Sequence, residues 1–227
     1  MEQKITVHKY QSCKSSKSCY PVFLVETSSL AKRKPQRRSG PPSANGLSVR
    51  RSTDGRSWVL VHPRCARDRS EDLEEAQLMV DAGEFELATD ELRWLLADCA
   101  EFIAAHALLG ELALATNNDV ALARGHFGAG YQLGLQTLRR AKMPTPLLYS
   151  QPANRSFFDA GRGLAWCLAT LEKPDMAQEV VDTLLNFDKS DPLKLRAMLD
   201  EFRSGGLPVV DLLSNFPDRK ADESGDT

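Results

Sequence analysis

The sequence predicts an all-α protein: a helical-hairpin solenoid, with a disordered basic N-terminal arm and a small β-hairpin before the helices. From Asp68 almost to the C-terminus, apolar residues recur at helical spacing in consecutive segments joined by short turns. Before them, two β-rich runs flank the turn dipeptide Asp54-Gly55. We therefore expect a disordered arm over 1–45, a hairpin and linker over 46–66, a helical domain over 67–216 and a disordered acidic tail over 217–227.

Charge is distributed unevenly along the chain. The 227 residues carry a formal net charge of −2, but residues 1–69 hold 15 Lys and Arg against 4 Asp and Glu, whereas residues 70–227 hold 14 against 27. Such asymmetry indicates a basic arm on an acidic body, and the arm is expected to contact nucleic acid, an acidic partner or the body itself. Apolar runs fall short of the roughly 18 residues that a membrane span needs, so we expect no membrane contact.

The predicted hairpin consists of strands over 47–51 and 57–62. An Asp-Gly pair between two β-rich runs is a strong turn signal, and Pro63 ends the second strand because proline has no N–H to donate. An isolated hairpin is marginal in water, so it is expected to pack on the helices.

Four helices are expected before residue 142. The first begins at Asp68, where Glu71 three residues later resembles a capping box, and ends at Gly83, a left-handed cap. The apolar spacing places the next three at about 85–96, 102–115 and 120–140. The fourth contains Gly125, Gly128, Gly130 and Gly134, each costing about 0.5–1 kcal/mol relative to Ala, and tight packing against a neighbouring helix is the expected compensation.

Prolines at 144, 146 and 152 interrupt the helical pattern over 142–153. Asn154 is then expected to cap a fifth helix over 157–171. Pro174 opens a sixth helix that ends near Phe187, Asp191-Pro192 opens a seventh that ends near Phe202, and 209–216 forms a last short one.

One short pattern recurs three times: a turn, then an alanine, at Ala88, Ala123 and Ala177. The first interval is about 35 residues, close to the tetratricopeptide period of 34, and the second is longer by the proline-rich insertion. In these residues the chain resembles the tetratricopeptide repeat family, as three degenerate repeats over about 70–202. Leu109-Gly110 falls at the family's Leu-Gly position, and Gly83 and Phe85 fall at its turn glycine and aromatic positions.

The chain departs from the family pattern in each repeat. Glu75-Ala76 replaces the Leu-Gly pair in the first repeat, the turn of the second has an extra residue, and Glu172 stands where the third turn would have glycine. These departures affect the helix register more than the helical-hairpin architecture.

The resemblance implies a binding protein whose inner groove is lined by the first helix of each pair. Aligning the repeats places four residues on or near this groove: Gln77, Glu111, Arg162 and Trp166. Arg155, in the distinctive segment 152–158, has no evident structural role and joins this set. We expect a non-catalytic protein–protein interaction adaptor or scaffold that needs no cofactor and binds an unidentified protein or peptide. For Trp166, packing between hairpins is the alternative.

The first alternative is a nucleic-acid-associated protein that binds the phosphate backbone through its arm. The basic residues concerned are Lys32, Arg33, Lys34, Arg37 and Arg38. Aromatic residues do not interleave them, so base stacking is not indicated, and a solvated tail is the other reading.

The second alternative is an enzyme with a site in the groove. The chain contains none of the P-loop, nucleophile-elbow or His-Glu-x-x-His motifs, and His106 and His126 are assigned to different hairpins. A strongly perturbed titratable pair in a pocket would distinguish this alternative. A zinc site is not expected, because Cys13 and Cys19 are too widely spaced and lie far in sequence from the pair His62 and Cys65.

The cysteines indicate a reducing compartment, and hence the cytoplasm. They are odd in number and irregularly spaced: Cys13, Cys19, Cys65, Cys99 and Cys167. Cys99 and Cys167 lie in apolar helical contexts, where we expect them to act as small hydrophobic residues. The apolar run 21–25 is too short for a signal-peptide core.

Overall fold

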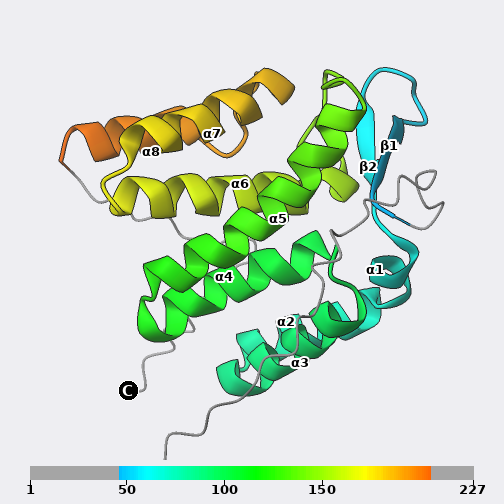
Figure 1. Cartoon of the computed structure of the whole chain (residues 1–227), viewed down its shortest axis with the longest axis vertical. Coiled ribbons are helices and arrows are strands. Elements are labelled where there is room, and N and C mark those ends of the chain that lie inside the picture. Colours follow the sequence, from blue (N-terminus) through cyan, green and yellow to red (C-terminus); the bar gives the residue numbers. More distant parts are fainter. Residues whose placement is uncertain (1–45, 206–227) are drawn as a thin grey trace, which may run out of the picture. The chain divides into compact units, whose positions relative to one another are not determined.

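The computed structural model describes residues 46–205 and confirms the all-α class with a small β-hairpin before the helices (Figure 1). Within these residues the elements are β1 (Ser48–Arg51), β2 (Trp58–Val61), α1 (Arg64–Asp68), α2 (Ser70–Asp81), α3 (Phe85–Asp98), α4 (Ile103–Asn117), α5 (Val120–Arg140), α6 (Pro152–Thr170), α7 (Pro174–Phe187) and α8 (Leu195–Arg203). The predicted arm over 1–45, the helix over 209–216 and the tail over 217–227 lie outside the described residues.

The hairpin forms where the Asp-Gly signal placed it. Strands β1 and β2 pair antiparallel, with Arg51 opposite Trp58 and Ser48 opposite Val61. The hairpin is held at both ends by the rest of the described chain. The Leu47 N–H donates to a carboxylate oxygen of Glu101 at 3.0 Å, just before α4, and the Trp58 N–H donates to the carbonyl of Pro146 at 2.9 Å. The predicted packing on the helices is therefore confirmed.

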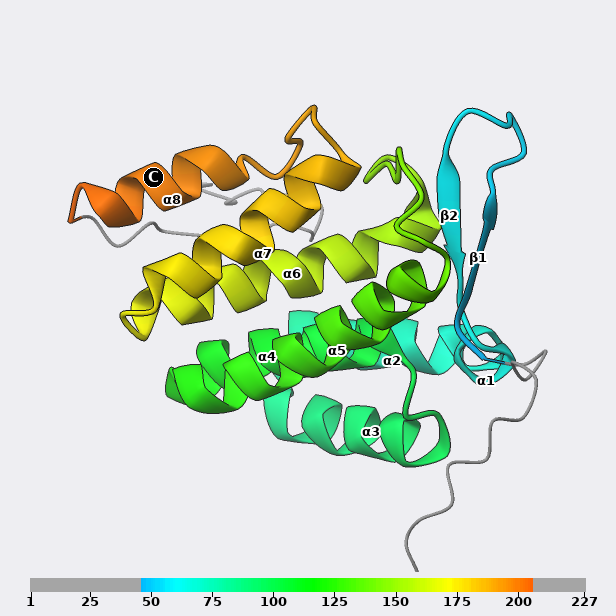
Figure 2. The same cartoon turned by 45° about the horizontal axis from the view of Figure 1, so that its top comes forward.

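The helices follow one another as antiparallel neighbours in the pairs α2/α3, α4/α5 and α6/α7, with α8 against α6 and α7 (Figure 2). Each pair is joined by a turn with one left-handed residue: Gly83 (φ 79°), Asn118 (φ 49°) and Glu172 (φ 56°). In the first and third turns, the next N–H donates to the carbonyl five residues back, as in a Schellman cap. In the second turn Asp119 reaches back six residues, to Ala113, which matches the extra residue noted in the sequence.

The recurring alanines occupy one structural position. Ala88, Ala123 and Ala177 are each the fourth residue of α3, α5 and α7, and each is fully buried. A small side chain at this position lets the second helix of a pair approach its neighbours closely.

The glycines of α5 divide into two groups. A Cβ on Gly134 would lie 2.3 Å from Cδ2 of Phe157, and one on Gly130 would lie 3.3 Å from Cβ of Ala160, both on α6. A Cβ on Gly125 would have no neighbour within 4 Å. Tight packing against α6 therefore explains Gly130 and Gly134 but not Gly125.

Three predicted helix starts differ from the structure. The capping box at Asp68 does not form, because Asp68 ends α1 and pairs with Arg64 at 3.2 Å, while α2 begins at Ser70 without a side-chain cap. Helix α6 begins at Pro152, five residues early, so Asn154 lies inside its first turn instead of capping it. Helix α8 begins at Leu195, after Lys194 at the N-cap, and not at Asp191-Pro192; the Asp191 carboxylate accepts the N–H of Leu195 at 2.7 Å.

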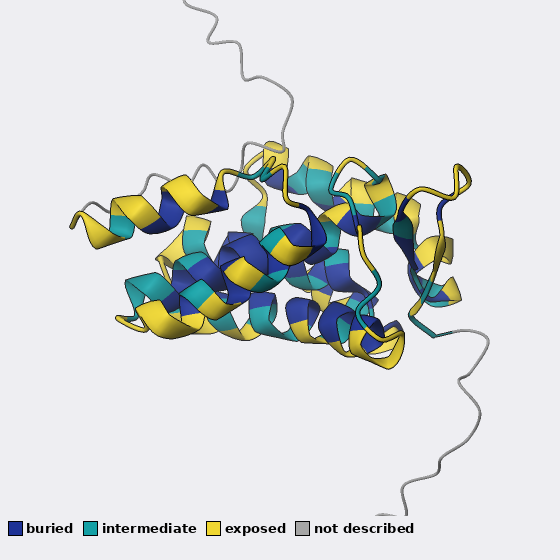
Figure 3. Ribbon diagram, turned by 90° about the horizontal axis from the view of Figure 1, so that it is seen from above, coloured by how far each residue is buried: buried dark blue, intermediate teal, exposed yellow. Residues whose placement is uncertain are grey.

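Buried residues concentrate on the faces that helices turn toward one another (Figure 3). One apolar cluster joins the hairpin to α4, α5, α6, α7 and α8, and a second joins α1, α2, α3 and α4. Helix α4 contributes to both, which explains why it is apolar nearly all round. Among the described residues, each helix is either too short or too polar to cross a bilayer.

Candidate functional site

A cavity of about 690 Å³ opens where α2, α4 and the start of α6 come together. We call it the α2–α4–α6 groove. Its lining includes apolar, acidic and basic side chains: His62, Ala66, Arg67, Ser70, Leu73, Glu74, Gln77, Asp81, Phe102, Ala104, Ala107, Leu108, Glu111, Pro152, Ala153, Arg155, Ser156 and Asp159. These helices are the first members of the three helix pairs.

The structure brings three of the five predicted binding residues into this groove. Gln77 comes from α2, Glu111 from α4 and Arg155 from α6. Arg162 is not among the lining residues, and its side chain is buried on α6. Trp166 also lies outside the lining and packs edge-on against Phe202 of α8, with ring centroids 6.5 Å apart.

Glu111 is the chemically unusual residue of the groove. It is only 9% exposed, and its carboxylate makes none of the hydrogen bonds or ion pairs found among residues 46–205. Burial and, to a smaller extent, the Asp159 carboxylate raise its pKa to about 8, although the charge of Arg162 acts in the opposite direction. Burial and Asp159 outweigh Arg162, so at neutral pH Glu111 holds a proton.

Polar atoms are also left without partners on Gln77, which lines the same cavity as Glu111, and on Arg162, whose charge acts on Glu111. The Nε2 of Gln77 and the Nε of Arg162 are buried and lack a hydrogen-bond acceptor within the described part of the chain. A buried donor without an acceptor costs roughly 1–3 kcal/mol. Gln77 lines the groove, so a ligand carbonyl there would satisfy its donor.

Sequence reasoning missed Asp159, which lines the groove and lies one helical turn after Arg155 on α6. The phenol of Tyr149 donates to Oδ1 of Asp159 at 3.2 Å, and burial with the Asp159 charge raises the Tyr149 pKa to about 12. The guanidinium of Arg155 lies 6.0 Å from the centre of the Tyr149 ring. Helical spacing carried a usable signal, because residues 155, 159, 162 and 166 fall on one face of a helix.

Apolar side chains form the rest of the groove wall. Phe102 and Leu108 of the α4 region are at most 5% exposed, and Leu73 faces them from α2. At the hairpin end, Nε2 of His62 lies 2.7 Å from the carbonyl of Ala153, and burial lowers the His62 pKa. This contact fixes the segment after β2 to the first turn of α6.

The assignment of His106 and His126 to different hairpins is wrong. They belong to α4 and α5, which form one hairpin, and their ring centroids are 6.1 Å apart. Burial lowers the pKa of both histidines, and the charges of His106 and Arg93 lower the pKa of His126 further.

The interpretation of Cys99 as a free apolar residue is also wrong. Cys99 forms a disulfide with Cys65, which links the start of α1 to the end of α3. Cys167 is free and buried, as expected. Because Cys65 is disulfide-bonded, its sulfur is not available as a thiolate ligand for a metal. Residues 46–205 contain no cluster of three or more His, Cys, Asp or Glu that could hold a metal ion. Cys13 and Cys19 lie outside the described residues.

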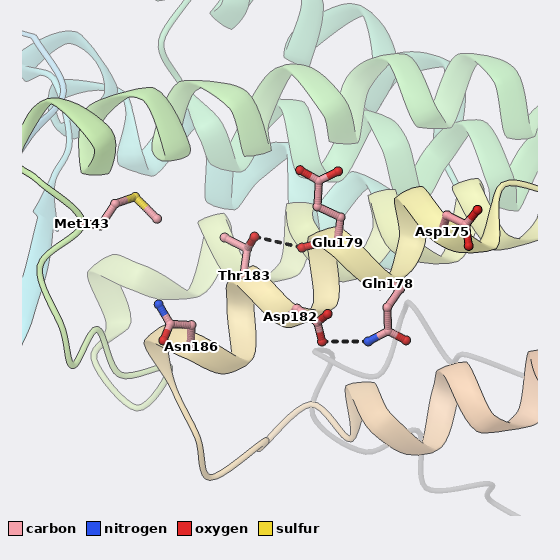
Figure 4. Close-up of a pocket in the computed structure, with 7 residues that line it drawn as sticks. All are labelled: Met143, Asp175, Gln178, Glu179, Asp182, Thr183 and Asn186. Carbon is pink, nitrogen blue, oxygen red and sulfur yellow. Dashed lines mark hydrogen bonds between the residues drawn. The ribbon is translucent and has the colours of Figure 1, made fainter.

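A second cavity, of about 460 Å³, runs along the outer face of α7 beside Met143 (Figure 4). Its acidic residues Asp175, Glu179 and Asp182 are exposed. Two hydrogen bonds join residues of its lining: Gln178 donates to Asp182 at 2.7 Å, and Thr183 donates to the backbone carbonyl of Glu179 at 2.8 Å. Because its acidic side chains are solvated, this cavity is a weaker candidate than the α2–α4–α6 groove.

Comparisons of the chain with protein-family models, with curated proteins and with solved structures give no match.

Proposed function

We propose that this protein is a non-catalytic interaction adaptor that binds a protein segment in the α2–α4–α6 groove of a tetratricopeptide-like helical domain. The resemblance is supported by the three left-handed turns and by the equivalent burial of Ala88, Ala123 and Ala177. First helices that line a shared concave surface are the usual binding arrangement of such repeats.

One observation carries the proposal: the groove combines an apolar wall with buried polar groups that have no partner. Gln77 offers a buried Nε2 donor without an acceptor, and Glu111, a residue only 9% exposed, offers a carboxyl group without a hydrogen bond or ion pair among the described residues. An extended peptide supplies both carbonyl acceptors and N–H donors at regular intervals. Sites of this composition, mostly apolar with a few placed polar groups, are typical of ligand grooves.

The proposal is tested by a substitution that fills the groove with a large side chain in the full-length protein. Ala104 lines the groove and is partly exposed, so Ala104→Trp is expected to block the groove while the fold is kept. The matched control is Met176→Trp, at a residue 52% exposed on α7. Proteins captured at high salt are identified by mass spectrometry. The expected result is a discrete partner lost with Ala104→Trp and kept with Met176→Trp; a partner kept by both variants contradicts the proposal.

The nucleic-acid alternative rests on Lys32, Arg33, Lys34, Arg37 and Arg38, which lie outside the described residues. Binding through them would weaken steeply with salt. Changing all five to serine in the full-length chain would then abolish retention of nucleic acid, whereas Ala104→Trp would leave it unchanged.

An enzyme is a second candidate, because Glu111, a carboxyl group with a raised pKa, lines a cavity that Asp159 also lines. A carboxylic acid that stays protonated at neutral pH is suited to general-acid catalysis. A hydrolytic activity of the purified chain that disappears in both Glu111→Gln and Ala104→Trp, and is kept in Met176→Trp, would favour this candidate over the adaptor.

From the number and spacing of the cysteines we also propose a cytoplasmic location. The Cys65–Cys99 disulfide counts against it, because such bonds persist mainly in oxidising compartments. Alkylation of thiols in intact cells, followed by mass spectrometry of the two cysteine peptides, decides between the two locations.

A further inference from the structure

Glu111 forms the floor of the α2–α4–α6 groove, and its carboxylate has no ion-pair partner among the described residues. This carboxyl group is nine-tenths buried, faces the groove and has no hydrogen bond or ion pair within residues 46–205. Arg162 is the cation that acts on it, from outside the groove lining, and it does not offset the combined effect of burial and Asp159. In the free groove a proton supplies the balance.

The rim of the groove does not select for charge in the same way. Glu74 and Asp81 are matched there by Arg67 and Arg155, so both signs are present among the exposed lining residues. Exposed charges are screened and contribute little to selectivity. We therefore expect the buried Glu111 to contribute more than these exposed charges to the selection of a partner side chain.

A donor and an acceptor are unused in the same cavity. The Nε2 of Gln77 is buried and lacks an acceptor, and the carboxyl group of Glu111, which lines the same cavity, makes no hydrogen bond or ion pair with the described residues. A peptide backbone carbonyl would satisfy the first, and an ammonium or guanidinium group would satisfy the second with a charge-assisted hydrogen bond.

We propose that the groove recognises a lysine or arginine side chain of a partner peptide, with the cationic head on the Glu111 carboxylate and a backbone carbonyl of the same peptide on Gln77 Nε2. This inference rests on the proposed binding function and names the chemistry of its ligand. The hydrocarbon stem of the cationic side chain lies along Phe102 and Leu108, which bury it while the head reaches Glu111.

Cation binding is coupled to proton release. Glu111 holds a proton in the free protein at neutral pH, since its pKa is raised to about 8, and it must ionise to pair with the ligand. Affinity is therefore expected to tighten about tenfold from pH 6 to pH 7 and to level off above pH 8. Lysine and arginine keep their charge over this range, so the ligand does not contribute to the change.

The experiment screens full-length protein against an immobilised library of random nonapeptides. The expected result is an enrichment of Lys or Arg at one position of the retained peptides. Glu111→Gln, which removes the charge and keeps the shape, is expected to abolish the enrichment and to weaken the best peptide at least tenfold. Glu75→Gln, at an exposed α2 residue outside the groove, removes the same charge and is expected to change neither.

The outcomes separate this inference from the proposed function. Retained peptides that lack a cationic position, but are lost with Ala104→Trp, overturn the inference and keep the groove as the binding site. Failure of Ala104→Trp to affect any peptide overturns both.

A third outcome concerns the chain's own basic residues. A second screen uses the full-length chain with Lys32, Arg33, Lys34, Arg37 and Arg38 changed to serine. If only this variant retains cationic peptides, the basic residues 32–38 of the chain itself occupy the groove in the unchanged protein. That result overturns the proposal of a separate partner peptide. Equal retention by both forms supports the separate partner.

Discussion

The side-chain amide of Asn154 is bonded directly to the backbone of Leu60, 94 residues earlier in the chain. The Leu60 N–H donates to Oδ1 of Asn154 at 2.9 Å, and Nδ2 of Asn154 donates to the carbonyls of Trp58 and Leu148 at 3.1 and 2.9 Å. Asn154 is fully buried. One residue in the first turn of α6 thus fastens β2 and the proline-rich segment to the helices and fixes one end of the groove.

Asn154→Ala is expected to destabilise the protein. The substitution leaves the Leu60 N–H and two carbonyls without partners, and unpaired buried groups of this kind cost at least about 2 kcal/mol together. Urea unfolding measures the loss, and hydrogen exchange should show faster exchange of the Leu60 amide. Asn186→Ala, at an exposed position on α7, is the control. An unchanged Leu60 amide would contradict the role given to Asn154.

Two glycines of α5 are expected to respond in opposite directions to alanine. Gly134→Ala places a Cβ 2.3 Å from Cδ2 of the fully buried Phe157, so it should destabilise by about 1–3 kcal/mol. Gly125→Ala meets no atom within 4 Å and should stabilise by about 0.5–1 kcal/mol. Parallel urea titrations give both values. Equal effects would mean that α5 and α6 do not approach closely at Gly134.

Glu111 should make stability depend on pH. Its pKa is about 8 in the folded protein and ordinarily 4.5, so between these values the folded state binds a proton that the unfolded state does not. The free energy of unfolding therefore falls as pH rises from about 5 to about 8, by at most about 1.4 kcal/mol per pH unit. Glu111→Gln should remove this slope and become progressively more stable than the wild type.

The control for that measurement is Glu75→Gln, whose carboxylate is exposed. It should run parallel to the wild type at each pH. A Glu111→Gln profile that also stays parallel to the wild type would show that the carboxyl group is not desolvated.

Reduction of the Cys65–Cys99 disulfide should destabilise the helical domain. The bond closes a loop with a sequence separation of 34, and removing it costs about 3–4 kcal/mol in the chain-entropy description. Thermal melts with and without dithiothreitol measure the change. The double variant Cys65→Ser and Cys99→Ser should melt at the lower temperature under both conditions. Wild-type protein whose melting does not respond to dithiothreitol would show that the bond does not form.

Local chemistry in the sequence determined the elements. Alternating β-rich runs around Asp54-Gly55 specified the hairpin, because turn type depends on adjacent residues. Helical periodicity located the helices, and Pro174 marked the first residue of α7. Glutamate carries no turn signal of its own. Alignment of the three repeats nevertheless placed Glu172 at the turn-glycine position, and its φ in the structure is left-handed.

Only the tertiary structure decided which of these residues act together. Asn154 reads as a cap in the sequence, but packing against the hairpin gives its amide three distant backbone partners. Cys65 and Cys99 pair because α1 lies beside the end of α3, a proximity that spacing alone does not encode. The same holds for Glu111: its residue type was visible in the chain, whereas its raised pKa comes from burial and from Asp159, a residue of another helix. Desolvation and charge–charge interactions depend on three-dimensional position, so the sequence supplied the helix that carries this group and the fold supplied its chemistry.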